Sequence, residues 1–126
     1  INDSKATNIN SVIVAINTYD QPIVLILGGF NKGANFRLLL PHIKSSHVRD
    51  IVSYGDAGGQ INTALGDAVR SVQVTDLSSA VKKAQLMAAP GDIVLLSPGC
   101  ASYDEFSNFE ERGNHFKSII KNLAIL

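Results

Sequence analysis

Residues 90–116, PGDIVLLSPGCASYDEFSNFEERGNHF, decide the fold. Behind the turn signal Pro90-Gly91-Asp92, the residues Ile93–Leu96 form a short, unbroken apolar run. Such a run fits a strand covered on both faces, as in parallel α/β sheets. Small and hydroxyl-bearing residues follow at 97–102, just after the carboxyl end of this expected strand. In open α/β sheets the ligand crevice lies beyond the carboxyl ends of the strands. The pattern leaves two interpretations open: a ligand site, or an ordinary turn into the next helix.

Outward from this stretch, apolar runs alternate with segments of helical periodicity. The expected strands are Ile23–Leu27, Val48–Tyr54 (alternating, with one wetter face), Ser71–Val74 and the central run above. The expected helices are Ile9–Tyr19 (capped by Asn8 or Thr7), Phe36–Ile43, Gln60–Leu65, a helix capped by Asp76 or Ser78 with Leu77, Val81, Ala84, Leu86 and Met87 as its apolar residues, and about Asn108–Leu126. Regular alternation predicts an α/β fold: one three-layer, Rossmann-like domain over residues 1–126, with a mainly parallel sheet flanked by helices.

The composition narrows the class of protein. Apolar residues make up 45% and charged residues 17% of 126 residues, which indicates a globular domain with a core. Lys+Arg and Asp+Glu both number 11, so the chain lacks the charge excess of a protein that binds nucleic acid or an acidic membrane. No apolar run approaches the roughly 20 residues that span a bilayer. The single cysteine indicates a reducing compartment. Because the chain opens on Ile1-Asn2-Asp3 without a methionine, we expect an excised piece of a larger protein.

Three polar loops are expected at one edge of the sheet: INDSKATN (1–8), GGFNKGANF (28–36) and SPGCASYDEF (97–106). Lys5 and Lys32 bring positive charge, and hydroxyls come from Thr7, Ser97 and Ser102. Together with backbone N–H groups at helix starts, this set suits a small ligand with carboxylates or phosphates. The spacing of the second loop is not that of a Walker A loop, and a lone loop lysine is more often simply solvated.

Other chemistries have weaker support. Cys100 has no histidine base near it in sequence, and no GxSxG motif is present. The three histidines lack metal-ligand spacing, so we expect no metal site: His42, His47 and His115. Four acids resemble a catalytic cluster, but acids are expected at a helix start: Asp104, Glu105, Glu110 and Glu111. Arg112 is expected to pair with one of them.

The motifs INDSKATN, LGGFNKGANF and LLSPGCASYDEFSNFEERGNHF resemble the C-terminal domain of the Mur ligase family, in the branch that adds D-glutamate. The resemblance covers essentially the whole chain. It implies a cytoplasmic, ATP-dependent amide ligase of peptidoglycan precursor synthesis. In that family UDP-N-acetylmuramoyl-L-alanine is activated as an acyl phosphate, which the amine of D-glutamate attacks. The resemblance places ATP and Mg²⁺ mainly in a central domain, whose P-loop is absent here, so the isolated domain is expected to be inactive.

Position by position, the resemblance implies four D-glutamate contacts: Thr7, Lys32, Ser102 and Phe109. Lys32 would be the counter-charge to one carboxylate and Thr7 a hydroxyl donor. Ser102 and the Phe109 N–H would serve the other carboxylate. At the nucleotide side, Asp3 would bind ribose and Lys5 the reacting phosphate region, which makes Lys5 the expected catalytic residue.

Other readings stay open at this point. The chain could be the matching domain of another Mur ligase or of a folylpolyglutamate synthase-like ligase. It could also be a free-standing Rossmann-like module that binds a small molecule, or a purely structural interaction domain. A GxxGKT-type P-loop upstream in the parent reading frame would separate a ligase from the last two.

Overall fold

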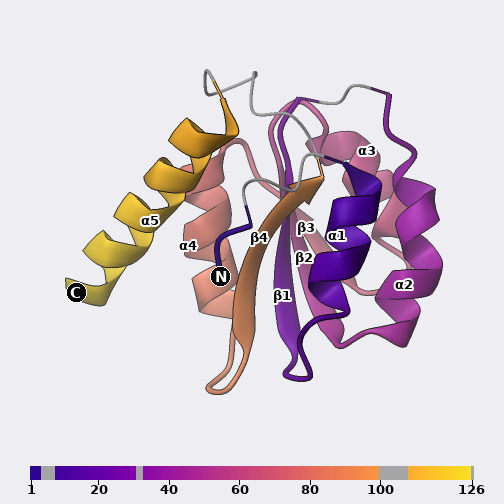
Figure 1. Cartoon of the computed structure of the whole chain (residues 1–126), viewed down its shortest axis with the longest axis horizontal. Coiled ribbons are helices and arrows are strands. Elements are labelled where there is room, and N and C mark those ends of the chain that lie inside the picture. The colour runs from indigo at the N-terminus through magenta and orange to yellow at the C-terminus, as the bar shows by residue number, and fades with distance from the viewer. Residues whose placement is uncertain (4–7, 31–32, 100–107, 126) are drawn as a thin grey trace.

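The computed structural model describes residues 1–3, 8–30, 33–99 and 108–125, with side chains in the last range as far as Ser118 (Figure 1). Four strands form one parallel sheet: β1 (Ile23–Gly28), β2 (Val48–Tyr54), β3 (Arg70–Gln73) and β4 (Ile93–Gly99). Their order across the sheet is β3-β2-β1-β4. The predicted α/β class, with a parallel sheet between helices, is confirmed.

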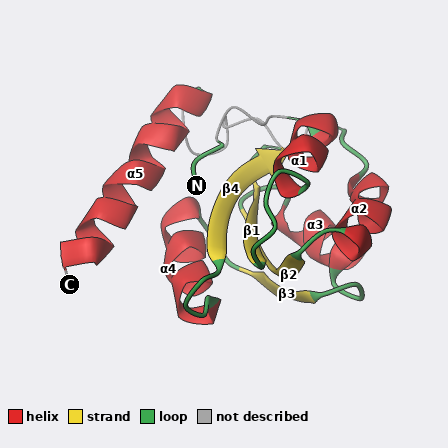
Figure 2. Ribbon diagram, turned by 60° about the horizontal axis from the view of Figure 1, so that its bottom comes forward, coloured by secondary structure: helices red, strands yellow, loops and turns green. Residues whose placement is uncertain are grey.

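Helices cover both faces of the sheet. One face carries α1 (Ile9–Ile16), the 3-10 helix η1 (Phe36–Leu39), α2 (Leu40–Ser45) and α3 (Gly58–Leu65), and the other carries α4 (Leu77–Met87) and α5 (Phe109–Ile125) (Figure 2). Each face has its own apolar cluster, one around Leu25 and Ile51 and the other around Ile26 and Val52. The domain is therefore three-layered. None of the helices in the described part of the chain is both long and apolar enough to cross a membrane.

The prediction that one face of β2 is more exposed to water is wrong. Six of its seven residues are buried, including Asp50 and Ser53. The strand lies between β1 and β3, and α3 and α4 pack against it. The side chains of Asp50 and Ser53 are therefore inside the domain, where they need polar partners. Ser53 donates to the Val72 carbonyl (3.4 Å), and Asp50 has arginine partners described below.

Two helices differ from their predicted form. The segment predicted as one helix over Phe36–Ile43 is a 3-10 turn followed by α2, because Pro41 in the first turn of α2 has no N–H and would clash with the carbonyl four residues earlier. The helix predicted to reach Tyr19 ends at Ile16, where the Thr18 hydroxyl donates to the Val14 carbonyl (2.8 Å).

One residue of the predicted apolar stripe on α4 lies outside the core. Leu86 is 83% exposed, whereas Leu77, Val81 and Ala84 are fully buried. Leu86 follows Ala84 by two positions, and residues two apart do not share a helix face. The predicted cap of this helix is confirmed, since the Asp76 carboxylate accepts from the Ser79 amide (2.8 Å).

The strand order creates a switch point between β1 and β4. From β1 the chain moves outward to β2 and β3 by way of helices on one face, and it returns to β4 by way of α4 on the other face. Ligands of open α/β sheets bind at such a point, beyond the carboxyl ends of the two strands. The last residues of the two strands, Gly28 and Gly99, are paired there.

Candidate functional site

Glycines end both strands at the switch point. Gly28 of β1 and Gly99 of β4 are paired across the sheet. A Cβ at Gly28 would lie 2.3 Å from the Tyr54 carbonyl oxygen, well inside contact distance. Gly99 has φ +69°, and a Cβ there would lie 3.1 Å from the Val12 side chain of α1. A side chain at either position would crowd a neighbouring element, so glycine allows the backbone of the two strand ends to pack closely against Tyr54 and Val12.

The segment Ile1–Asp3 lies along the free edge of β4. The Leu96 amide donates to the Ile1 carbonyl (2.8 Å), and the Asp3 amide donates to the Leu96 carbonyl (2.6 Å). The fully buried Ser97 then donates its hydroxyl hydrogen to the Asp3 carboxylate (3.0 Å). Asp3, the predicted ribose ligand, is therefore held by both its backbone and its side chain at the carboxyl end of β4.

The start of α5 brings a second predicted residue to the same place. Asn108 caps the helix, because its side-chain oxygen accepts from the Glu111 amide (2.8 Å). Phe109 is the first helical residue and is half-buried. Glu110 and Glu111 occupy the first turn, where the helix dipole favours acids. The N–H groups at such a start face outward and favour anions.

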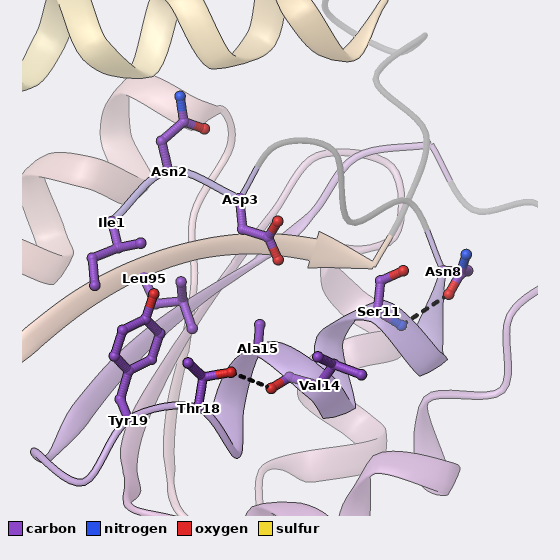
Figure 3. Close-up of a pocket in the computed structure, with 10 residues that line it drawn as sticks. All are labelled: Ile1, Asn2, Asp3, Asn8, Ser11, Val14, Ala15, Thr18, Tyr19 and Leu95. Carbon is purple, nitrogen blue, oxygen red and sulfur yellow. Dashed lines mark hydrogen bonds between the residues drawn. The ribbon is translucent and has the colours of Figure 1, made fainter.

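Two hollows meet at Asp3. The first, the α1 groove, has a volume of about 600 Å³ and separates residues 1–3 from α1 (Figure 3). The second, the α5 hollow, has a volume of about 380 Å³ and lies between Asn2, Asp3 and the first turns of α5. Phe109 lines the α5 hollow together with Asp3. The structure thus places a predicted nucleotide residue and a predicted D-glutamate residue on one hollow.

The other predicted site residues lie outside the described part of the chain: Lys5, Thr7, Lys32 and Ser102. Among their described neighbours, Gly99 ends β4 and Asp3 lies beside Leu96 of that strand. Asp3 and Asn8 flank the first loop, Gly33 follows the second, and Gly99 and Asn108 flank the third (Figure 1). The roles of these four side chains and the convergence of the three loops therefore stay predictions.

Several candidates that we set aside on sequence grounds can be located in the structure, and Glu110 of the acid group lines the α5 hollow. No group of three or more potential metal ligands is found among the described residues. His42 is half-buried and His47 is exposed. His115 of α5 forms a hydrogen bond with Ser78 of α4, with 2.9 Å between Nε2 and Oγ. Arg112 is fully buried near the start of α5. Cys100, Asp104 and Glu105 lie outside the described residues.

A buried charge network at the opposite edge of the sheet was not predicted. Asp50, 2% exposed, accepts from Arg70 Nε and Nη2 (2.9 Å each) and from Arg49 Nε (3.1 Å). Arg49 also contacts Asp92 (2.8 Å). Burial of the carboxylate opposes its ionisation, but the hydrogen bonds from Arg70 and Arg49 outweigh burial, and the pKa of Asp50 lies below its usual value. This network joins β2 to β3 and to the turn before β4, which makes its role structural.

Sequence reasoning also missed Asn2. Its side-chain amide donates to the Gly113 carbonyl of α5 (3.2 Å). The two residues are 111 positions apart, so no local pattern points to the contact. In the sequence, only the polar character of residues 2–8 indicated that this segment takes part in polar contacts.

Comparison with known proteins gives the family. The family described as "Mur ligase, glutamate ligase domain" matches residues 1–100. Similar relatives are named UDP-N-acetylmuramoylalanine–D-glutamate ligase, from Chlamydia caviae (44% identical, 100% of this chain), Clostridioides difficile (45%, 98%) and Salinibacter ruber (41%, 98%). The chain spans only 27–30% of the length of these relatives. With a family match over most of its residues and relatives that align with nearly all of them, the chain belongs to the Mur ligase family, in its glutamate ligase domain.

Proposed function

We propose that residues 1–126 are the D-glutamate-binding domain of a longer, cytoplasmic ATP-dependent ligase that joins D-glutamate to UDP-N-acetylmuramoyl-L-alanine. The observation that carries the proposal is the agreement of relatives: those that match at least 98% of the chain at 41–45% identity carry the name of this ligase. The geometry supports it, because open α/β sheets bind ligands at a switch point such as the one between β1 and β4, and Gly28 and Gly99, which open two of the three polar loops, are paired there.

In the proposed reaction, the alanyl carboxylate of the nucleotide-linked substrate takes the terminal phosphoryl group of ATP and becomes an acyl phosphate, with release of ADP. The D-glutamate amine attacks the acyl carbon, the C–O bond to phosphate breaks, and the amine loses a proton. Bound ATP and Mg²⁺, held mainly by another domain, supply the activation. Residues 1–126 would bind and orient the attacking amino acid and close over the nucleotide, which keeps water from the acyl phosphate.

Each proposed contact comes from the family resemblance and fits the charge of the ligand. D-glutamate carries two carboxylates, so Lys32 would neutralise one, with the Thr7 hydroxyl as a further donor. The Ser102 hydroxyl and the Phe109 N–H would bind the other carboxylate at the start of α5. On the nucleotide side, Asp3 would accept from ribose hydroxyls, and Lys5 would stabilise the charge that develops on the transferred phosphoryl group. The anchoring of Asp3 by Ser97 supports its part of this assignment.

Lys32→Ala in the full-length ligase tests the proposal. A hydrogen bond to a charged group contributes about 1.5–3 kcal/mol, so we expect the KM for D-glutamate to rise more than tenfold. Lys44→Ala is the matched control, because Lys44 is an exposed lysine of α2. Steady-state kinetics with D-glutamate as the varied substrate gives the answer. An unchanged D-glutamate dependence in Lys32→Ala would remove Lys32 from the site. A parent reading frame without an upstream P-loop would refute the ligase.

A further inference from the structure

A polar contact joins the segment that carries Asp3 to the helix that carries Phe109. The Asn2 side-chain nitrogen donates to the Gly113 carbonyl (3.2 Å). In Figure 3 the side chain of Asn2 points toward α5, while Ile1 and Asp3 point to the other side of the segment. This is the alternation of an extended chain, in which neighbouring side chains face opposite ways. Asn2 is therefore placed to bind the helix while Asp3 stays at the strand end.

Both partners of this contact have fixed positions. Asn2 forms a parallel bridge with Leu96 of β4, so its backbone belongs to the sheet. Gly113 is buried in the interior of α5, where glycine is less favourable than alanine. The backbone carbonyl of Gly113 is the acceptor, so the Asn2 side chain joins the sheet edge directly to the backbone of α5. The contact consequently transmits the position of the sheet edge to α5.

We propose that Asn2 is a positioning residue that couples the nucleotide side of the site to the D-glutamate side. The inference rests on the proposed function, which assigns Asp3 to the nucleotide and Phe109 to D-glutamate. Both residues line the α5 hollow, and Asn2 ties its two walls together. Asn2 acts through α5: the hydrogen bond fixes the height of the first helical turn above the end of β4, and with it the Phe109 amide.

A second polar contact of α5 provides an internal control. Ser78 of α4 lies 2.9 Å from His115, in an exposed position. This contact attaches α5 to α4 and does not reach Asp3 or the α5 hollow. Removing it takes away one hydrogen bond that holds α5. A difference between the two removals therefore isolates the position of the contact from the mere number of bonds to α5.

The experiment compares Asn2→Ala with Ser78→Ala in the full-length ligase, with D-glutamate varied at saturating and at low ATP. One hydrogen bond between uncharged groups corresponds to roughly a two- to tenfold change in an equilibrium constant. We expect Asn2→Ala to raise the KM for D-glutamate by that factor with kcat within about twofold, and to weaken the effect of ATP on this KM. Ser78→Ala should leave both quantities unchanged. Thermal melts of both variants report stability separately.

Each outcome decides the inference. It is overturned if Asn2→Ala changes only the melting temperature, or if Ser78→Ala raises the KM as much as Asn2→Ala does. If Asn2→Ala fails to fold, Asn2→Leu, which keeps a similar volume without the N–H donor, takes its place with the same expected KM. Absence of D-glutamate-dependent activity in the unmutated ligase would refute the proposed function itself. Normal activity with an unaltered KM in the Asn2 variants would refute only the coupling.

Discussion

Replacing Asp50 by asparagine should destabilise the domain in a pH-dependent way. The carboxylate is 2% exposed and accepts three N–H bonds from two arginines, at 2.9, 2.9 and 3.1 Å. Hydrogen bonds to charged groups contribute about 1.5–3 kcal/mol each, but the Arg70 and Arg49 side chains are 60% and 41% exposed, so water screens them. Asparagine keeps one acceptor. We therefore expect a loss of about 2–3 kcal/mol in the free energy of unfolding at pH 7.

The sign of the pH dependence follows from the lowered pKa of Asp50. A carboxylate whose pKa is lower in the folded state stabilises the fold fully above its unfolded pKa of about 4, and this stabilisation disappears as the pH falls through the folded pKa. The difference in unfolding free energy between the unmutated chain and Asp50→Asn should consequently be constant from pH 7 to 5. Below about pH 4 it should shrink.

Urea unfolding followed by circular dichroism at several pH values measures both quantities. Asp67→Asn serves as the control, because Asp67 is an exposed acid just after α3, and its replacement should change the free energy by less than about 0.5 kcal/mol. The reasoning is refuted if Asp50→Asn is as stable as the control at pH 7. It is also refuted if the difference persists unchanged at pH 3, since the carboxylate would then not be the source.

Two further predictions concern glycine and the strand end. Gly28→Ala should destabilise the domain by about 1–3 kcal/mol, because the new Cβ would meet the Tyr54 carbonyl. Gly59→Ala in α3 should stabilise it by about 0.5–1 kcal/mol, because the new Cβ would lie 3.7 Å from its nearest neighbour, the Gln73 side chain. Equal urea midpoints for the two variants would contradict this. Ser97→Ala removes the hydrogen-bond donor to Asp3 and should raise the KM of the full-length ligase for ATP about threefold or more. The KM for D-glutamate should change less. An unchanged KM for ATP would show that Asp3 does not bind the nucleotide.

Local patterns were enough to predict the elements. The run Ile93–Leu96 needs no knowledge of its neighbours to be read as a buried strand, and the capping side chains of Asn8 and Asp76 act on amides three residues away. Because parallel strands end at a common edge, the sequence also predicted that the polar loops would emerge together. The failures were local as well: Pro41 divided a predicted helix, and the alternation of β2 was misread as exposure.

The roles of individual site residues came from the family resemblance and not from the pattern. Asp3 and Phe109 line one hollow, and the roles of all six residues stay predictions: Asp3, Lys5, Thr7, Lys32, Ser102 and Phe109. Hydrophobic periodicity indicates whether a residue faces the core, but it does not show which loop atoms come into contact at the edge of a sheet.

The α/β class and the alternation of strands and helices along the chain followed from the sequence alone, and the edge at which a ligand binds was predicted from it. These depend on hydrophobic periodicity and on capping within a few residues. Three features became visible only in the folded domain: the strand order β3-β2-β1-β4, the burial of Asp50 beside Arg70, and the contact of Asn2 with Gly113. Each of these joins groups 20 to 111 residues apart, and such contacts form because the folded sheet fixes their register and distance, which no short stretch of sequence encodes.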